Sequence, residues 1–178
     1  MAFGMRVVGY EPYVDTSQLP QGVEMRSILE DALHEGDYVT LHVAGTQANR
    51  GLIGVKQLAA MRANAVLINT TRGMVVNEDA LFDALVAGKI SGAALDVFLH
   101  EPVPRDERLV NLENVIVTPH NAGNTHEAKE RMASHCVQNI LSFYRTGRPD
   151  WCVDANVFRG EKVLEQQTGK PDTETKEE

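Results

Sequence analysis

The chain has little cysteine, no long apolar run and no excess of positive charge. Cys136 and Cys152 are the only cysteines among 178 residues, too few for a disulfide framework. We therefore expect two buried thiols in a reducing compartment, the cytoplasm, with no role in metal binding. No apolar stretch approaches the roughly 20 residues that a membrane-spanning helix needs. The start, "MAFGMRVVGY", lacks the pattern of a secretory signal peptide.

The charge balance is acidic. Lys and Arg number 17 against 25 Asp and Glu, giving a formal net charge of −8. Because nucleic-acid phosphates would be repelled, we predict no nucleic-acid partner, although local donors could still hold a small anion. Hydrophobic residues make up 43% of the chain and charged residues 24%, values typical of a globular protein with a real core.

Strand-like and helix-like segments alternate along the chain. The predicted strands are 5–12, 38–43, 65–70, 91–98 and 114–120, and the predicted helices are 25–37, 55–62, 77–89 and 125–147. This alternation predicts an α/β fold with a mostly parallel sheet and flanking helices. The polar segment 159–178 has no aromatic residue, and we expect it to be a disordered tail.

Residues with acid, base or anion-binding chemistry follow successive predicted strands. They are Glu11, Arg72, Asp96 with Glu101, and His120. Each could be an ordinary turn, capping or surface residue when taken singly. Ligands of open parallel sheets bind beyond the carboxyl ends of the strands, however, and all five lie there. Their joint placement therefore favours one site over five unrelated surface residues.

The set fits hydride transfer on a 2-oxo or 2-hydroxy acid. A guanidinium such as that of Arg72 can hold a carboxylate with two planar donors. A histidine such as His120 can give or take a proton near neutral pH, and a carboxylate beside it orients the ring. The hydride has to come from a nicotinamide cofactor, since no side chain supplies one. Glu11 is placed to accept hydrogen bonds from ribose hydroxyls, which favours NAD over NADP.

The sequence resembles the D-isomer-specific 2-hydroxyacid dehydrogenase family, which includes phosphoglycerate and glycerate/hydroxypyruvate dehydrogenases. The segments that carry the resemblance occur in the family's order: "AFGMRVVGYEP", "LHVAGTQANRGLIG", "LINTTRGMVVNEDAL", "GAALDVFLHEP" and "NVIVTPHNAGNTHEA". The resemblance implies that Arg72 holds the substrate, that His120 is the general acid/base and that Glu101 is its partner. It also implies a homodimer and a cofactor site. The residues implied at that cofactor site are Glu11, Val43, Thr70, Thr71, Arg72, Asp96, His120, Ala122 and Gly123.

The sequence departs from the family pattern in two places. His42-Val43-Ala44-Gly45-Thr46 stands where the family usually has His-x-Pro-Leu-Thr, which predicts a looser loop against the cofactor. The first strand and the G-x-G-x-x-G turn are also absent, as is a substrate-binding domain. We therefore expect residues 1–158 to form a partial Rossmann-like NAD-binding domain, in which the strand near Val8 either pairs with the strand 38–43 or leaves an open edge.

Two classes of function follow from these departures. The first is an NAD-dependent oxidoreductase acting on the CH-OH group of a D-2-hydroxy acid, present here as a fragment. The alternative is a noncatalytic module of the same fold, similar to a corepressor, or an inactive remnant. The sequence leaves the identity of the acid open, because the pocket for its side chain would be built by the absent domain.

Overall fold

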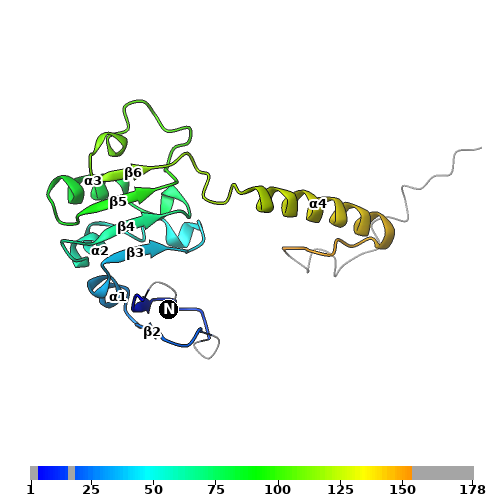
Figure 1. The fold of residues 1–178 in the computed structure, drawn as a ribbon, viewed down its shortest axis with the longest axis horizontal. Coiled ribbons are helices and arrows are strands. Elements are labelled where there is room, and N and C mark those ends of the chain that lie inside the picture. Colours follow the sequence, from blue (N-terminus) through cyan, green and yellow to red (C-terminus); the bar gives the residue numbers. More distant parts are fainter. Residues whose placement is uncertain (1–3, 16–18, 154–178) are drawn as a thin grey trace, which may run out of the picture. The chain divides into compact units, whose positions relative to one another are not determined.

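The computed structural model describes residues 4–15 and 19–153. The chain divides into two compact units, residues 1–122 and residues 123–178, and each is described by itself. Figure 1 labels the helices and strands. The predicted tail 159–178 lies outside the described residues.

The first unit is built on a four-stranded parallel sheet. Its order is β3-β4-β5-β6, and every neighbouring pair is parallel, which confirms the predicted sheet. The strands are β3 (Tyr38–Leu41), β4 (Val66–Asn69), β5 (Gly92–Leu95) and β6 (Val115–Val117). Helix α2 (Val55–Ala60) connects β3 to β4, and α3 (Glu78–Val86) connects β4 to β5. Figure 1 shows the four strands side by side in this order.

A second, smaller sheet contains the first part of the chain. β1 (Val7–Gly9) pairs in parallel with β2 (Val23–Met25) and not with β3, so β3 has an open edge among the described residues. Of the two arrangements expected for this region, the structure has the open edge. The strand β2 was not predicted, and the prediction that a helix begins at Met25 is wrong. Helix α1 is Leu29–Glu35, because the extended pairing with β1 continues through Met25.

Paired charges connect the small sheet to α1. Arg6 next to β1 contacts Glu24 of β2 and Glu35 of α1, and Arg26 also contacts Glu24 and Glu35. The two guanidinium groups hold the pKa of both glutamates down, at about 2. These four side chains are partly exposed, so they orient β2 and α1 more than they stabilise the unit.

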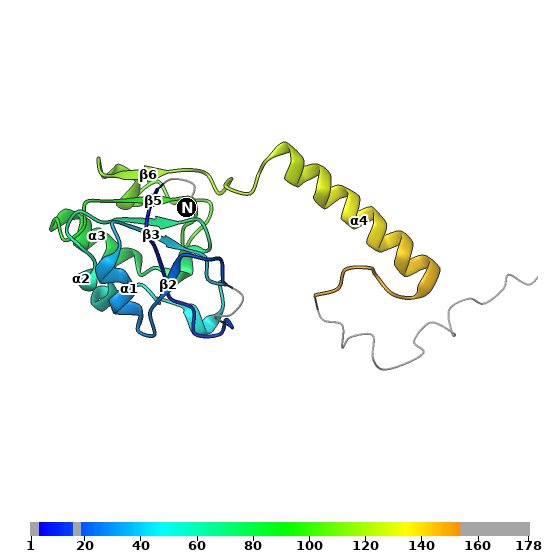
Figure 2. The same cartoon turned by 60° about the horizontal axis from the view of Figure 1, so that its bottom comes forward.

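The core lies between one face of the four-stranded sheet and the three helices α1, α2 and α3, which Figure 2 shows from a second direction. Leu67 in β4 is fully buried, and alternate residues of β4 are less buried, as expected when one face of a strand is covered more than the other. The helices contribute mainly leucines from their inner faces. These core leucines are Leu33 from α1, Leu58 from α2, and Leu81 and Leu85 from α3.

Two helices begin at residues that can cap them. The Asn77 side chain accepts a hydrogen bond from Ala80 N before α3, and the Thr125 hydroxyl accepts one from Ala128 N before α4 (His126–Thr146). Helix α4 ends at Gly147, whose φ of 72° is the left-handed conformation that glycine adopts without steric cost. The N-cap at Thr125 and the end of α4 at Gly147 confirm the sequence prediction.

The second unit consists of α4 and the segment that follows it. No residue of α4 is buried, and Trp151 stacks on His135 with ring centroids 4.3 Å apart. Cys136 and Cys152 are both exposed, so the prediction of buried thiols is wrong. Both cysteines lie in this unit, and its helix presents no covered face for a thiol. Within residues 4–15 and 19–153, no helix combines the length and apolar character needed to cross a bilayer.

Candidate functional site

His120 and Glu101 form a hydrogen-bonded pair at the carboxyl edge of the sheet. His120 Nδ1 lies 2.6 Å from Glu101 Oε2, and the ring is 47% exposed. The second carboxylate oxygen of Glu101 accepts a hydrogen bond of 2.9 Å from the Phe98 N–H. The hydrogen bond from His120, then the one from Phe98, hold the pKa of Glu101 below its ordinary value. An ionised Glu101 therefore fixes the ring through Nδ1 and leaves Nε2 for proton transfer.

Asp96 holds the loop that carries His120. It is 4% exposed at the end of β5, and its Oδ1 accepts hydrogen bonds from the Thr118 hydroxyl (2.5 Å) and the Asn121 N–H (2.9 Å). Its Oδ2 accepts from the Ala122 N–H at 2.9 Å. Burial, the strongest influence, raises the pKa of Asp96, but these three hydrogen bonds outweigh it and the net shift is downward. His120 itself has φ of 50°, in the left-handed region that residues other than glycine adopt uncommonly and that Asn, Asp and His adopt most often among them.

The turn that carries Arg72 is shaped by a buried asparagine. Asn69, the last residue of β4, is 1% exposed. Its Oδ1 accepts hydrogen bonds from both the N–H and the hydroxyl of Thr71, and its Nδ2 donates to the Arg72 carbonyl. Sequence reasoning missed this residue. A polar side chain that ends an otherwise apolar strand was the available signal, because a buried amide has to find partners.

The Arg72 turn lies against the segment that leads to Glu101. Gly73 follows Arg72 and packs directly on the main chain of Phe98 and Leu99, where a Cβ atom would overlap it. Glu78, at the start of α3, accepts a hydrogen bond of 2.6 Å from the Leu99 N–H. The charge of Arg72 contributes to the lowered pKa of Glu101, so the two groups are within electrostatic range. The structure thus brings Arg72, Glu101 and His120 to one edge.

The loop after β3 contacts the segment that follows Arg72. Gly51 N–H donates to the Met74 carbonyl, and Ile53 forms an isolated parallel bridge with Val76. The preceding residues are held by Asn49, whose side chain donates to the Ala44 carbonyl at 2.9 Å. These contacts connect the loop that departs from the family pattern to the Arg72 turn, and its looseness against a bound cofactor stays a prediction.

The remaining residues predicted at the cofactor site occupy the ends of several strands. Glu11 follows β1, is exposed, and accepts a hydrogen bond from Tyr13 N–H at 2.9 Å, so its turn is fixed. Because Glu11 belongs to the smaller sheet, the structure does not join it to the Arg72 edge. The others follow β3, β4 or β6, and Gly123 is the first residue of the second unit: Val43, Thr70, Thr71, Ala122 and Gly123.

These residues fit a dinucleotide in chemical terms. Glu11 has one carboxylate oxygen bonded to Tyr13, and a carboxylate offers further acceptor positions to ribose hydroxyl donors. Thr70 and Thr71 place small polar side chains at the end of β4, and the Arg72 and His120 side chains are exposed beside them.

Comparison with known proteins agrees with this geometry. A family profile described as "D-isomer specific 2-hydroxyacid dehydrogenase, NAD binding domain" matches residues 1–122. A glyoxylate reductase of Korarchaeum cryptofilum is 42% identical over 158 residues, which are 88% of this chain and 47% of that protein. A D-3-phosphoglycerate dehydrogenase of Methanocaldococcus jannaschii is 41% identical over 145 residues, 81% of this chain and 28% of that protein.

A solved structure of the same family is also similar to this chain. The NAD-complexed D-isomer specific 2-hydroxyacid dehydrogenase of Lactobacillus delbrueckii ssp. bulgaricus superposes with a TM-score of 0.76 and 31% identity, covering 86% of this chain and 50% of that one. The chain spans about half the length or less of the proteins that it matches here. The profile match covers more than half of the chain and includes every strand of both sheets. The chain therefore belongs to the D-isomer specific 2-hydroxyacid dehydrogenases, and residues 1–122 are part of their NAD-binding domain.

Proposed function

We propose that this chain carries the catalytic residues of an NAD-dependent D-2-hydroxyacid dehydrogenase. The reaction is the reversible reduction of a 2-oxo acid at its carbonyl group. The observation that carries this proposal is the Glu101–His120 hydrogen bond of 2.6 Å, at the same sheet edge as Arg72. Such a reaction requires two groups of the protein. One is a proton donor whose ring is held in place, and the other is a guanidinium near the carboxylate that holds that ring.

Each side chain has a defined part in the reaction. Arg72 binds the substrate carboxylate and orients the carbonyl, since its planar fork matches a carboxylate. In the direction of reduction, protonated His120 gives its Nε2 proton to the carbonyl oxygen, and in the reverse direction neutral His120 takes the hydroxyl proton. Glu101 remains ionised, orients the ring through Nδ1 and stabilises its charged form. The nicotinamide cofactor, when bound, would supply the hydride as NADH in the direction of reduction and accept it as NAD+ in the reverse direction.

Cofactor preference rests on Glu11. Its carboxylate would accept hydrogen bonds from the adenosine ribose hydroxyls and repel a 2′-phosphate, so NADH is favoured over NADPH. Val43, Thr70, Thr71, Ala122 and Gly123 would line the rest of the site. The family resemblance implies that Asp96 would lie near the nicotinamide end, and its hydrogen bonds with Thr118, Asn121 and Ala122 hold the segment beside it.

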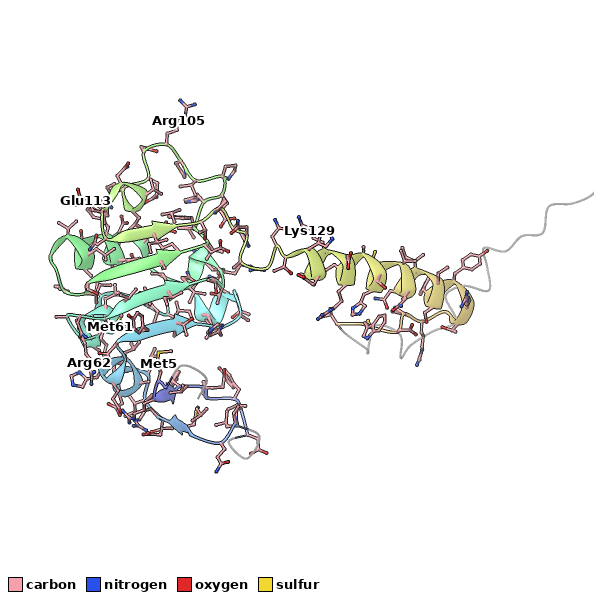
Figure 3. All side chains as sticks on the ribbon, viewed as in Figure 1. Met5, Met61, Arg62, Arg105, Glu113 and Lys129 are labelled. Carbon is pink, nitrogen blue, oxygen red and sulfur yellow. The ribbon has the colours of Figure 1, made fainter. Side chains whose placement is uncertain are left out.

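The first test is NADH binding to this chain, followed by fluorescence titration. We expect saturable binding that Glu11→Gln weakens, together with a smaller difference between NADH and NADPH, because the change removes charge and keeps an acceptor. The matched control is Glu113→Gln, an exposed glutamate between the short helix η4 (Leu109–Asn111) and β6, labelled in Figure 3. A folded chain that binds no NADH would overturn the proposal for the chain by itself.

The second test is NADH oxidation with glyoxylate, hydroxypyruvate and pyruvate. We expect Arg72→Lys to raise KM by about tenfold or more, because a point charge replaces a two-point clamp. His120→Asn should abolish the proton-transfer step, and asparagine is chosen because it tolerates the positive φ at this position. Turnover by His120→Asn at the rate of the unmodified chain would refute the assigned role.

We also propose that the protein works as a homodimer in the cytoplasm. The family resemblance supports the dimer, and the low cysteine content supports the reducing compartment. Light scattering coupled to gel filtration at several protein concentrations measures the mass of the particle. A monomer at all concentrations up to those used for NADH titration would contradict the dimer.

A further inference from the structure

We propose that Glu78 is a positioning residue for the Glu101–His120 pair, an inference that rests on the proton-transfer role proposed for that pair. Glu78 is the first residue of α3, and its Oε1 accepts a hydrogen bond of 2.6 Å from the Leu99 N–H. Leu99 stands two residues before Glu101 in the chain. The bond therefore attaches the segment that carries Glu101 to a helix of the core.

Residues 98–101 form a bend that two carboxylates hold through consecutive amide groups. Phe98 N–H donates to Glu101 Oε1 at 2.9 Å, and the next amide, that of Leu99, donates to Glu78. Glu101 uses its other oxygen, Oε2, for His120 Nδ1. Because the two amides are neighbours in the chain, a shift of Leu99 carries the Phe98 N–H with it. The Glu101 carboxylate follows that donor and changes its direction toward His120.

Glu78 can serve as a fixed point because α3 is anchored at its start. The Asn77 side chain caps the helix by accepting a hydrogen bond from Ala80 N. Leu81, three residues after Glu78, is fully buried in the core. The backbone that carries Glu78 therefore has one defined position, from which the side chain reaches the bend 98–101.

The bend can rearrange if the Glu78 bond is lost. It packs on Gly73, where a Cβ atom would lie 2.2 Å from the Leu99 nitrogen, and this contact blocks movement toward that glycine. Leu99 is 42% exposed, so an amide released from Glu78 can bond water instead. Loss of the bond should therefore change the conformation of the bend without unfolding the unit.

The charge of Glu78 decides how firmly the bend is held. Burial, the strongest influence, raises the pKa of Glu78, and the hydrogen bond from Leu99 opposes that rise. Among the nearby charges, Glu107 and Asp79 raise the pKa and His100 lowers it. A hydrogen bond to an ionised acceptor is roughly twice as strong as one to a neutral acceptor, so the ionised carboxylate holds the Leu99 amide best.

The test compares Glu78→Ala with Glu78→Gln, and Asp79→Ala is the matched control. Glutamine keeps an oxygen acceptor and loses the charge, whereas alanine loses both. Asp79 is exposed, lies next to Glu78 in the same turn of α3, and its carboxylate bonds Arg108 rather than the bend. Circular dichroism checks that each variant is folded.

Two readouts are used on the full chain. NMR of isotope-labelled glutamate carboxyl carbons follows the titration of Glu101, whose signal is assigned by its loss in Glu101→Gln. Steady-state rates of NADH oxidation with glyoxylate give kcat and KM separately.

We expect Glu78→Ala to raise the midpoint of the Glu101 titration. The hydrogen bond from His120 is the strongest influence on the pKa of Glu101 and lowers it, so a displaced Glu101 returns toward its ordinary value. Loss of the Glu78 charge alone acts in the opposite direction, because removing a negative neighbour favours ionisation of Glu101. The sign of the shift therefore separates position from charge.

The kinetic constants should change in the same pattern. Glu78→Ala should lower kcat about tenfold and change KM less than about twofold, because proton transfer is misaligned while Arg72 is untouched. Glu78→Gln should keep kcat within about threefold of the unmodified chain, with a Glu101 midpoint that does not rise. Asp79→Ala should leave kcat unchanged and should not raise the midpoint.

Three outcomes separate this inference from the proposed function. A Glu101 midpoint that does not rise in Glu78→Ala would overturn the positioning role while the dehydrogenase proposal stands. A rise of equal size in Glu78→Gln would also overturn it, because the acceptor would then be irrelevant. If the unmodified chain shows no turnover, yet the midpoint rises in Glu78→Ala and not in Glu78→Gln, Glu78 does position Glu101 and the proton-transfer role of the pair is what fails.

Discussion

The replacement Asp96→Asn tests whether the buried carboxylate holds the His120 loop. Asparagine has nearly the same shape, and its oxygen can keep the hydrogen bonds from Thr118 and the Asn121 N–H. Its amide nitrogen, however, then faces the Ala122 N–H, so two donors meet where Oδ2 now accepts at 2.9 Å. A hydrogen bond to a charged group contributes about 1.5–3 kcal/mol. The variant weakens two of the three bonds by removing the charge and loses the third, which should cost about 2–4 kcal/mol in total.

Urea unfolding followed by circular dichroism at pH 7 measures this loss. The folded-state pKa of Asp96 is lowered, so its contribution is complete above the unfolded pKa and disappears as pH falls through the folded pKa. The difference between the two proteins should therefore persist at pH 5 and shrink below about pH 4. Thr118→Val, which removes a single donor to this charged group, should cost about 1.5–3 kcal/mol. A difference under about 0.5 kcal/mol for Asp96→Asn, or one that is equal at pH 3 and pH 7, would refute the reasoning.

Three further predictions use the same unfolding assay. Gly73→Ala should destabilise the unit by about 3 kcal/mol or more, because its Cβ would overlap the main chain of Phe98; a stable variant would show that this segment can move. Burial raises the pKa of Glu78, so its ionisation lowers stability as pH rises from its unfolded pKa to its folded pKa, and Glu78→Gln should flatten that slope; an unchanged slope would contradict the assignment. Leu67→Ala should cost about 2–5 kcal/mol because the side chain is fully buried in the central sheet, whereas a cost below about 1 kcal/mol would mean that the core collapses around it.

The alternation of segments was enough to predict the four-stranded sheet and its helices. Short apolar strands, the cap at Thr125 and the helix end at Gly147 each depend on local chemistry that a sequence displays directly. The strand β2 was missed because it has three residues and its apolar positions also match a helical period. Only the pairing with β1 decides between the two, and pairing is not local.

The candidate site was predicted less completely. Arg72, Glu101 and His120 could be named because each follows a strand, and strand ends of a parallel sheet converge. Asn69 was overlooked as a determinant of the Arg72 turn, because a single polar residue at the end of a strand does not show whether its side chain will be buried and bonded to the turn that follows. The cysteines were placed wrongly because low abundance says nothing about which side of a helix a thiol occupies.

The open edge of β3 has a consequence for backbone dynamics. Tyr38 is 65% exposed at the start of this strand, and the side of β3 that faces away from β4 has no strand partner in the described part of the chain. Amide hydrogens on that side should exchange with deuterium in minutes, whereas those of β4 and β5, bonded on both sides, should exchange only when the sheet opens. Exchange should then be fastest in the two edge strands, β3 and β6, and slowest in β4 and β5. Binding of a compound or a peptide strand along the β3 edge would slow amide hydrogen exchange in β3 and leave the exchange rates of the other strands unchanged.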